Sequence, residues 1–325
     1  MPYQNVTMAV MESATFDRRA LPENAEIDFW HAQDGWPLRR FRMGAGDRGA
    51  MLFLNGRADM IEKYLEPMAH WAARGWVVTS FDWRGQGGSG RFVPESDIGH
   101  CSDFRLWIDD LVAFFLEWRA ANPGPHVAVA HSMGGHLLSW ALAERRMALD
   151  AVALAAPMFG IKAGGLPGWA GAAISRFMCR TGDPARAAWP SDDEDAAHDR
   201  GRRERLTHCA ERYADEQWWR RTCPAIALGP PSWGWIAEAY RSTRGFERSP
   251  VAEGVAAPML ILAAENDKLV DMAAIRRIAR RLPDARLHVY GAEAAHEILR
   301  EADGVRIDAL SRIDAFLDER TPRPR

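Results

Sequence analysis

The sequence predicts an α/β fold, in which a mostly parallel central sheet carries helices on both faces. Short apolar segments alternate with amphipathic helical patterns over most of the chain, and that alternation is typical of a covered parallel sheet. The 325 residues are 47% hydrophobic, which is enough for a substantial core. The net charge of −3 comes from mixed charges and gives no indication of a nucleic-acid partner.

The first elements form a hairpin followed by a strand–helix–strand unit. Residues 26–43 predict two strands around a Gln-Asp-Gly turn. A strand at 50–56 precedes a helix at 61–75, and a further strand at 76–83 leads into a glycine-rich loop. This loop lacks the lysine and the spacing of a phosphate-binding loop. We expect Asp82 to brace it through hydrogen bonds.

The alternation continues in the later part of the chain. We expect, in order, a helix at 103–119, a strand at 126–132, a helix at 134–146, and strands at 150–158 and 257–267, then a helix at 272–283, a strand at 285–292 and a helix at 304–319. The helix at 103–119 is clearly amphipathic, because its large apolar residues share one face.

Residues 158–250 interrupt this pattern and predict a helical cap inserted into a core formed by residues 1–157 and 251–325. The insertion has no convincing buried strand, yet it holds six of the 14 tryptophans. A decorative surface insertion is the alternative. The clustered aromatic residues favour a cap that meets an apolar ligand, because large rings bury much area with few rotatable bonds.

Ser132 is the candidate nucleophile. It lies where a predicted buried strand ends and a helix begins, in the segment AVAHSMGGHL. A serine on such a sharp turn needs small residues two positions before and two after it, and these are Ala130 and Gly134. Alanine replaces the commoner glycine at the first position. The serine also needs a neighbouring base to remove its proton.

His296 is the candidate base among ten histidines. It follows the last predicted strand, just before the closing helix, and ligands bind at this carboxyl edge of open α/β sheets. His100, in a loop, is an alternative. His131 and His136 flank the serine, but side chains adjacent in sequence are expected to point elsewhere.

A carboxylate must orient the histidine and stabilise its charged form. Asp267 ends a predicted strand and is the first candidate, with Asp271 as the alternative. The chain order Ser132, Asp267, His296 is the order typical of α/β-hydrolases and differs from that of other serine hydrolase folds.

Two backbone amides are the candidates for an oxyanion hole. Met133 follows the nucleophile directly, and Arg57 follows the strand that ends at Asn55-Gly56. Only the backbone of Arg57 is implied in this role. Its side chain is expected to face solvent or an acidic neighbour.

These motifs resemble the monoacylglycerol lipase and lysophospholipase group of α/β-hydrolases, which includes lysophospholipase L2-like and serine aminopeptidase S33-type enzymes. The resemblance is carried, in the family's order, by FLNGRADMIEKY, FDWRGQGGSGR, GHCSDFRLWIDDL, AHSMGGHL, AENDKLV and AAHEILRE. It covers roughly residues 26–157 and 255–318, whereas the insertion matches only in position. Asn55 stands where many relatives have histidine, and Ala130 replaces a glycine, but neither change removes a catalytic group.

The resemblance implies a serine ester hydrolase with Ser132 as nucleophile, Asp267 as orienting acid and His296 as general base. It implies oxyanion donors at the Arg57 and Met133 amides. Monoacyl lipids, either lysophospholipids or monoacylglycerols, are the expected substrates. The alternatives are a short-chain or aromatic carboxylesterase, a transacylase with the same triad, and a non-catalytic ligand-binding protein. Aminopeptidase activity is disfavoured, because no acidic pair in the insertion is identified that would bind a free amine.

The remaining expectations concern cofactors, partners and location. We expect no metal and no organic cofactor, and the four cysteines form no CxxC pair or disulfide framework. The N-terminal residues do not read as a signal peptide, and free thiols suit a reducing cytoplasm. The tryptophan content is compatible with peripheral contact at a membrane surface. The acidic run at 192–195 is expected to be a solvated surface.

Overall fold

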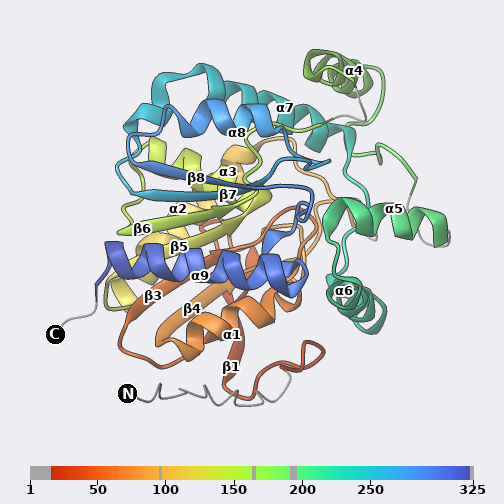
Figure 1. The fold of residues 1–325 in the computed structure, drawn as a ribbon. Coiled ribbons are helices and arrows are strands. Elements are labelled where there is room, and N and C mark those ends of the chain that lie inside the picture. Colours follow the sequence, from red (N-terminus) through yellow and green to blue (C-terminus); the bar gives the residue numbers. More distant parts are fainter. Residues whose placement is uncertain (1–15, 95–96, 163–165, 191–195, 323–325) are drawn as a thin grey trace, which may run out of the picture.

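The computed structural model describes residues 16–94, 97–162, 166–190 and 196–322 (Figure 1). The signal-peptide prediction and the acidic run at 192–195 therefore fall wholly or mostly outside the described residues. An eight-stranded sheet with the order β1-β2-β4-β3-β5-β6-β7-β8 forms the centre. Its strands are β1 (Ala25–His31), β2 (Pro37–Met43), β3 (Gly49–Leu54), β4 (Trp76–Phe81), β5 (His126–His131), β6 (Ala151–Ala155), β7 (Met259–Ala264) and β8 (Ala285–Tyr290).

The sheet is mostly parallel, as predicted. The hairpin strands β1 and β2 are antiparallel, and β2 is also antiparallel to β4. All other pairings are parallel. Each residue of β3, β4, β6 and β7 is buried, which follows from their apolar sequences, because strands covered on both faces cannot alternate with polar residues.

Helices cover both faces of the sheet, and alternate residues of one strand contact different layers. Leu52 and Leu54 of β3 pack in a cluster with α2 (Phe104–Ala121), α3 (Ser132–Ala143) and α8 (Met272–Ala279). Met51 and Phe53 pack in a second cluster with α1 (Leu65–Ala73) and α9 (Asp303–Arg320). The helix predicted at 61–75 begins as a 3-10 turn at Ile61–Tyr64 and continues as α1.

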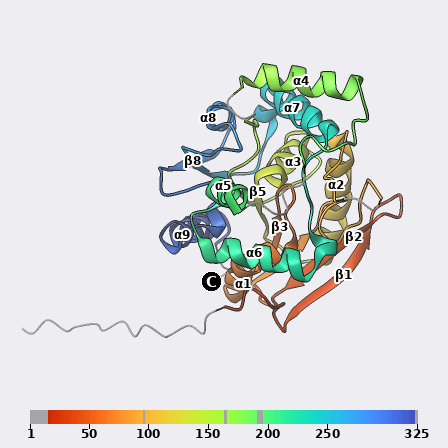
Figure 2. The same cartoon turned by 90° about the vertical axis from the view of Figure 1, so that its right-hand side faces the viewer.

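The chain between β6 and β7 is helical, and its described residues contain no strand. Its helices are α4 (Gly168–Arg180), α5 (Ala196–Leu206), α6 (Ala210–Thr222) and α7 (Trp233–Arg248) (Figure 2). α7 differs from the others, because its Phe246 is buried in the core and stacks on Phe159 with ring centroids 5.6 Å apart. We therefore propose that the cap consists of α4, α5 and α6, and that α7 belongs with the core.

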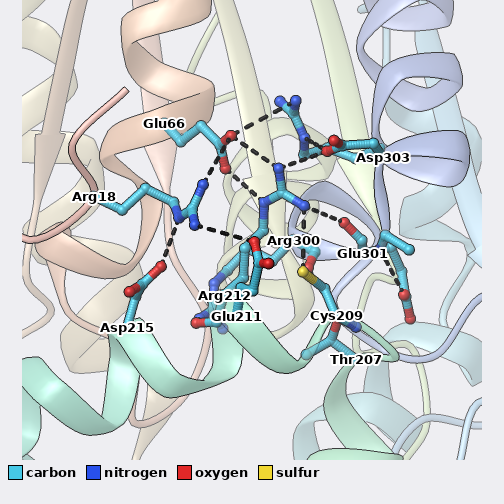
Figure 3. Close-up of polar contacts among 12 residues, drawn as sticks. Arg18, Glu66, Thr207, Cys209, Glu211, Arg212, Asp215, Arg300, Glu301 and Asp303 are labelled. Atoms are coloured by element: carbon cyan, nitrogen blue, oxygen red, sulfur yellow. Dashed lines mark hydrogen bonds and ion pairs between the residues drawn. The ribbon is translucent and has the colours of Figure 1, made fainter. Parts of the chain in front are cut away.

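α6 is fastened to the core by a cluster of ion pairs around Arg212 (Figure 3). The Arg212 guanidinium donates to Glu66 of α1 at 2.6 Å and to Asp303 of α9 at 2.7 Å. It also donates to the Glu301 carbonyl oxygen at 2.9 Å. Arg18 joins Asp215 of α6 at 2.6 Å. One arginine thus connects a cap helix to two helices of the core.

None of the helices in the described part of the chain has the length and apolar character needed to cross a bilayer.

Candidate active site

Ser132 lies on the sharp turn between β5 and α3 and has a backbone φ of +49°, which is uncommon for a residue other than glycine. Gly134 allows this turn, because a Cβ atom there would lie 2.4 Å from the Asn55 carbonyl oxygen. Ala130 is fully buried on β5, where its methyl group takes a place in the core. The strand-to-helix turn predicted at Ser132 is therefore present, with alanine in the first small position.

The structure brings Ser132, His296 and Asp267 together. His296 lies in the loop after β8, and Asp267 lies in the loop after β7. The His296 Nε2 atom is 3.0 Å from the Ser132 Oγ atom, and its Nδ1 atom is 2.7 Å from Asp267 Oδ2. The second Asp267 oxygen accepts hydrogen bonds from the Leu269 and Val270 amides at 2.7 and 3.0 Å.

The electrostatics of this trio suit a base that is charged during reaction. Burial alone lowers the pKa of His296, but the charge and hydrogen bond of Asp267 outweigh it and raise that pKa above its ordinary value. Burial raises the pKa of Asp267, but His296 and the two loop amides outweigh it and lower that pKa. Asp267 therefore remains ionised and accepts the Nδ1 proton, which leaves Nε2 facing the serine hydroxyl as an acceptor.

The loop after β3 lies against Ser132. A Cβ atom on Gly56 would lie 3.1 Å from the Ser132 Cβ atom. The Gly56 amide donates to Asp59 and the Ala58 amide donates to Gln86, at 2.8 and 2.7 Å. The Arg57 amide between them has no acceptor among the described residues. The Met133 amide lies in the first turn of α3, where amides have no partner within the helix.

The other predicted residues lie elsewhere. Asp271 caps α8 by accepting from the Ala273 amide, and His100 is hydrogen-bonded to Ser232 at 2.8 Å, so neither joins the trio. Asp82 accepts from the Ile61 and Gly88 amides at 3.0 and 2.8 Å, which confirms its bracing role.

The Arg57 side chain faces the insertion instead of open solvent, with Asp59 and Asp97 near enough to favour its charge. Its guanidinium lies beneath the cap and donates to the Gly229 carbonyl oxygen at 2.6 Å. The cause is the insertion, which passes over the loop after β3 and covers a position that the core alone would leave in solvent.

Sequence reasoning also missed His131 as a neighbour of the site. Its ring packs on His296 with centroids 4.8 Å apart. Burial, and then the nearby His296, lowers the pKa of His131 to about 3, so His131 is a neutral wall of the site. His131 directly precedes Ser132, so its side chain is expected to point away from the serine. The loop after β8 nevertheless brings His296 against the His131 ring.

A buried charge cluster below the trio was missed as well. Lys63 contacts Asp59 at 2.6 Å, Glu297 at 2.5 Å and Glu216 of α6 at 3.2 Å. Asp59 and Lys63 are four residues apart, and Glu297 follows His296 directly. This spacing is the only indication of the cluster in the sequence. Glu216, the partner from the cap, is far from the other members of the cluster along the chain.

Ser132 and His296 open into a cavity of about 1770 Å³ between the core and the cap. Only three of the six tryptophans of the insertion line it, namely Trp189, Trp233 and Trp235. The expectation that these tryptophans meet a ligand therefore holds at most for half of them. Among the described residues, no three His, Cys, Asp or Glu side chains are grouped so that they could hold a metal ion.

Comparisons with known proteins find similar sequences and similar structures. The family model described as serine aminopeptidase, S33, matches residues 45–303. The chain is 31% identical to lysophospholipase L2 of Escherichia coli K12 over 317 residues, which cover 90% of this chain and 89% of that protein. It is 30% identical to a probable lysophospholipase L2 of Haemophilus influenzae, with 83% and 84% covered.

Among solved structures, a soluble variant of monoglyceride lipase from Saccharomyces cerevisiae superimposes with a TM-score of 0.74. The match covers 95% of this chain and 100% of that chain at 17% sequence identity, so it bears on the fold alone.

Proposed function

This chain belongs to the serine aminopeptidase S33 family of α/β-hydrolases, and from that premise we propose that it hydrolyses the ester bond of monoacyl lipids with Ser132, His296 and Asp267. The observation that carries the proposal is the continuous hydrogen-bonded chain from the Ser132 hydroxyl through His296 to Asp267 at the floor of a large cavity. The family membership and the lysophospholipase relatives support ester hydrolysis as the reaction class.

The reaction proceeds in two acyl transfers. Ser132 attacks the ester carbonyl carbon while His296 Nε2 takes the hydroxyl proton, and Asp267 stabilises the imidazolium that forms. The Arg57 and Met133 amides donate to the oxyanion. His296 gives its proton to the leaving alcohol. Water then attacks the acyl-enzyme with His296 again as base, which releases the fatty acid and restores the serine.

The lining of the cavity supports a monoacyl lipid as substrate. Apolar side chains from the cap and the core face the cavity, including Leu166, Ile174, Trp189, Trp233 and Trp235. Its volume exceeds the roughly 300–1,000 Å³ usual for small-molecule pockets, and so leaves room for an acyl chain as well as a head group.

Peripheral contact with a lipid surface is part of the proposal. Five apolar side chains on or near α4 are exposed, namely Leu166, Trp169, Ile174, Phe177 and Trp189. Three of them also line the cavity, so the exposed apolar face continues into it. This continuity supports direct entry of a lipid from a membrane or micelle. The cytoplasmic location stays a prediction.

A fluorophosphonate probe, combined with esters of graded chain length and head group, tests the proposed function. The wild-type enzyme should be labelled at Ser132 and should cleave monoacyl lipids. Ser132→Ala should lose labelling and reduce turnover by about 10⁶-fold, because the nucleophile and its base act as one unit, while its circular dichroism spectrum stays unchanged.

Ser139→Ala is the matched control, because this serine is buried on the same helix and donates to the Gly135 carbonyl oxygen. It should keep both labelling and turnover. Full ester hydrolysis by folded Ser132→Ala enzyme would overturn the assignment of the nucleophile.

A further inference from the structure

The Arg57 side chain holds a positive charge in the cavity and has no ion-pair partner among the described residues. One Nη atom donates to the Gly229 carbonyl oxygen, and the Nε atom is buried and has no acceptor among the described residues. No carboxylate of the described residues lies within ion-pair distance of the guanidinium. Asp59 and Asp97 are close enough to favour its charge, but burial and the nearby Arg202 and Arg220 dominate and lower the pKa of Arg57 to about 9.

Among the described residues, Arg57 and Arg91 are arginines in closely packed surroundings whose hydrogen bonds go only to backbone carbonyl oxygens. Others pair with at least one carboxylate at 3.1 Å or less, namely Arg39, Arg84, Arg202, Arg212 and Arg300. A buried charge without a counter-charge is costly. An anionic group of a bound ligand would offset this free-energy cost, and without such a ligand the buried charge of Arg57 destabilises the fold.

The fold makes room for this guanidinium. A Cβ atom on Gly99 would lie 2.6 Å from an Arg57 Nη atom, so the glycine leaves the space that the arginine occupies. On the other side, the Trp235 ring lies 5.4 Å from the guanidinium carbon. The side chain is thus held between the core and the insertion, where Arg57 lines the cavity.

Further cations from the cap line the same cavity. They are Arg202 and Arg205 of α5 and Arg220 and Arg221 of α6. Within the part of the chain that the structure describes, the hydrogen bond that Arg205 donates goes to the Gly201 carbonyl oxygen of its own helix, at 3.2 Å. Among the carboxylates that line the cavity, Asp59 and Glu297 pair with Lys63, Asp267 pairs with His296, and Glu265 pairs with Arg276, while Asp97 lies near Arg57. Arg57 and Arg205 are thus two cations of the lining that pair with no carboxylate of the described residues.

We propose that Arg57 and Arg205 bind the phosphate of the substrate head group, so that the enzyme prefers lysophospholipids to uncharged monoacylglycerols. This rests on the proposed function. Arginine presents several N–H donors that match phosphate oxygens in pairs. The backbone of Arg57 is the oxyanion donor, and its side chain spans about the length of the glycerol that separates the ester carbonyl from the phosphate. One residue can therefore hold both ends of the polar part of the substrate.

The test compares lysophosphatidylglycerol with monoacylglycerol of the same acyl chain, both dispersed in an uncharged detergent. The measured quantity is the ratio of their kcat/KM values. Any disturbance of the oxyanion hole lowers both values and cancels in this ratio. The wild-type enzyme should favour the phosphate-containing lipid, and Arg57→Met should lower the ratio by about 10–100-fold, since hydrogen bonds to charged groups contribute roughly 1.5–3 kcal/mol.

Arg205→Met should lower the ratio in the same direction and keeps the test decisive if Arg57→Met fails to fold. Arg57→Lys should restore part of it, because lysine keeps the charge and loses the paired donors. Arg203→Met is the matched control, because Arg203 lies on the same helix and does not line the cavity, and it should leave the ratio unchanged.

The outcomes separate this inference from the proposed function. If the wild-type enzyme cleaves both lipids and the ratio stays within about threefold in the folded Arg57→Met and Arg205→Met variants, the phosphate site is wrong and the hydrolase assignment stands. If the wild-type enzyme cleaves neither lipid, both proposals are overturned. Inhibition of monoacylglycerol cleavage by millimolar inorganic phosphate, lost in Arg57→Met, would support the site with free phosphate as the probe.

Discussion

At the residue scale, the site depends on one strained position. The positive φ of Ser132 costs about 1–3 kcal/mol for a residue with a side chain. Contacts from two directions hold it, because Gly134 lies against the Asn55 carbonyl and the Ser132 carbonyl accepts from the Met158 amide at 2.9 Å. This backbone conformation holds the Ser132 hydroxyl away from α3 and toward His296.

The pairing of His296 with Asp267 predicts the pH dependence of the reaction. The neutral form of His296 is the active base, so kcat/KM should fall as the pH drops through its pKa, which Asp267 raises. Asp267→Asn removes that charge, so the acidic limb should move to lower pH. Turnover should also fall by about 10⁴-fold, because the amide no longer favours the productive tautomer. A pH–rate profile with an uncharged ester measures both effects.

Asp271→Asn is the control for this experiment, since Asp271 caps α8 and lies outside the trio. It should leave the profile where it is in the wild-type enzyme. If the acidic limb of the profile moves in Asp271→Asn and stays in place in Asp267→Asn, then Asp271 is the orienting acid and the assignment of Asp267 is wrong.

At the scale of elements, the two arms of the cap are attached in different ways. α6 is joined to α1 and α9 through Arg212, Glu66 and Asp303 (Figure 3), and to the buried lysine below the site through Glu216. α4 packs mainly on α7 and exposes much of its apolar surface (Figure 2). α6 therefore fixes one wall of the cavity, whereas α4 forms the wall that faces outward.

Removal of the Arg212 charge should loosen that fixed wall. We expect Arg212→Met to lower the free energy of unfolding by up to about 3 kcal/mol, the low end for a broken buried pair, because Asp303 stays largely solvated. Amide exchange in α6 should rise more than in the strands. Urea unfolding and hydrogen exchange measure the two effects.

Arg286→Met provides the comparison, because Arg286 pairs with Glu319 on the exposed surface and such pairs contribute little. Equal protection of α6 in wild-type and Arg212→Met proteins would show that the ion pairs do not hold the cap.

At the scale of the molecule, three apolar side chains, Leu166, Ile174 and Trp189, are exposed and also line the cavity. A substrate with an acyl chain can leave a lipid surface without exposing that chain to water, provided that the face around α4 meets the lipid. The driving force is the burial of apolar area, about 1.5–3 kcal/mol for each large side chain that becomes covered.

Trp169→Ser combined with Phe177→Ser should therefore weaken binding to phosphatidylcholine vesicles by at least about tenfold. Both side chains are more than 60% exposed, and neither lines the cavity, so hydrolysis of a short soluble ester should stay near the wild-type rate. Vesicle sedimentation measures the binding. Leu116→Ser with Ile307→Ser is the control, because it removes two exposed apolar groups from α2 and α9. If this double variant loses as much vesicle binding, the protein does not bind lipid through the face around α4.

The fold and the trio could be predicted from the sequence because each depends on local order. Ser132, Asp267 and His296 each follow an apolar strand, and parallel strands bring their carboxyl ends to one edge. The role of the Arg57 side chain and the partners of Lys63 could not be predicted, because they depend on where the insertion folds back over the core. The cap boundary at residues 158–250 stays a prediction, because the sequence marks the insertion by its lack of a buried strand and such a criterion does not separate α7 from the other helices.

The insertion leaves and rejoins the sheet at neighbouring strands, because β6 and β7 are hydrogen-bonded partners. Near its start, the Lys162 amide donates to the Leu269 carbonyl oxygen in the loop after β7 at 2.9 Å, so the segment that leaves β6 lies beside the loop that carries Asp267. Because the segment takes no part in the strand pairing of the sheet, it can lengthen, shorten or change composition during evolution without altering the strand order or the spacing of the three reacting residues. The residues that carry out the reaction and the residues that select the substrate therefore lie on separate segments of the chain, which can change independently.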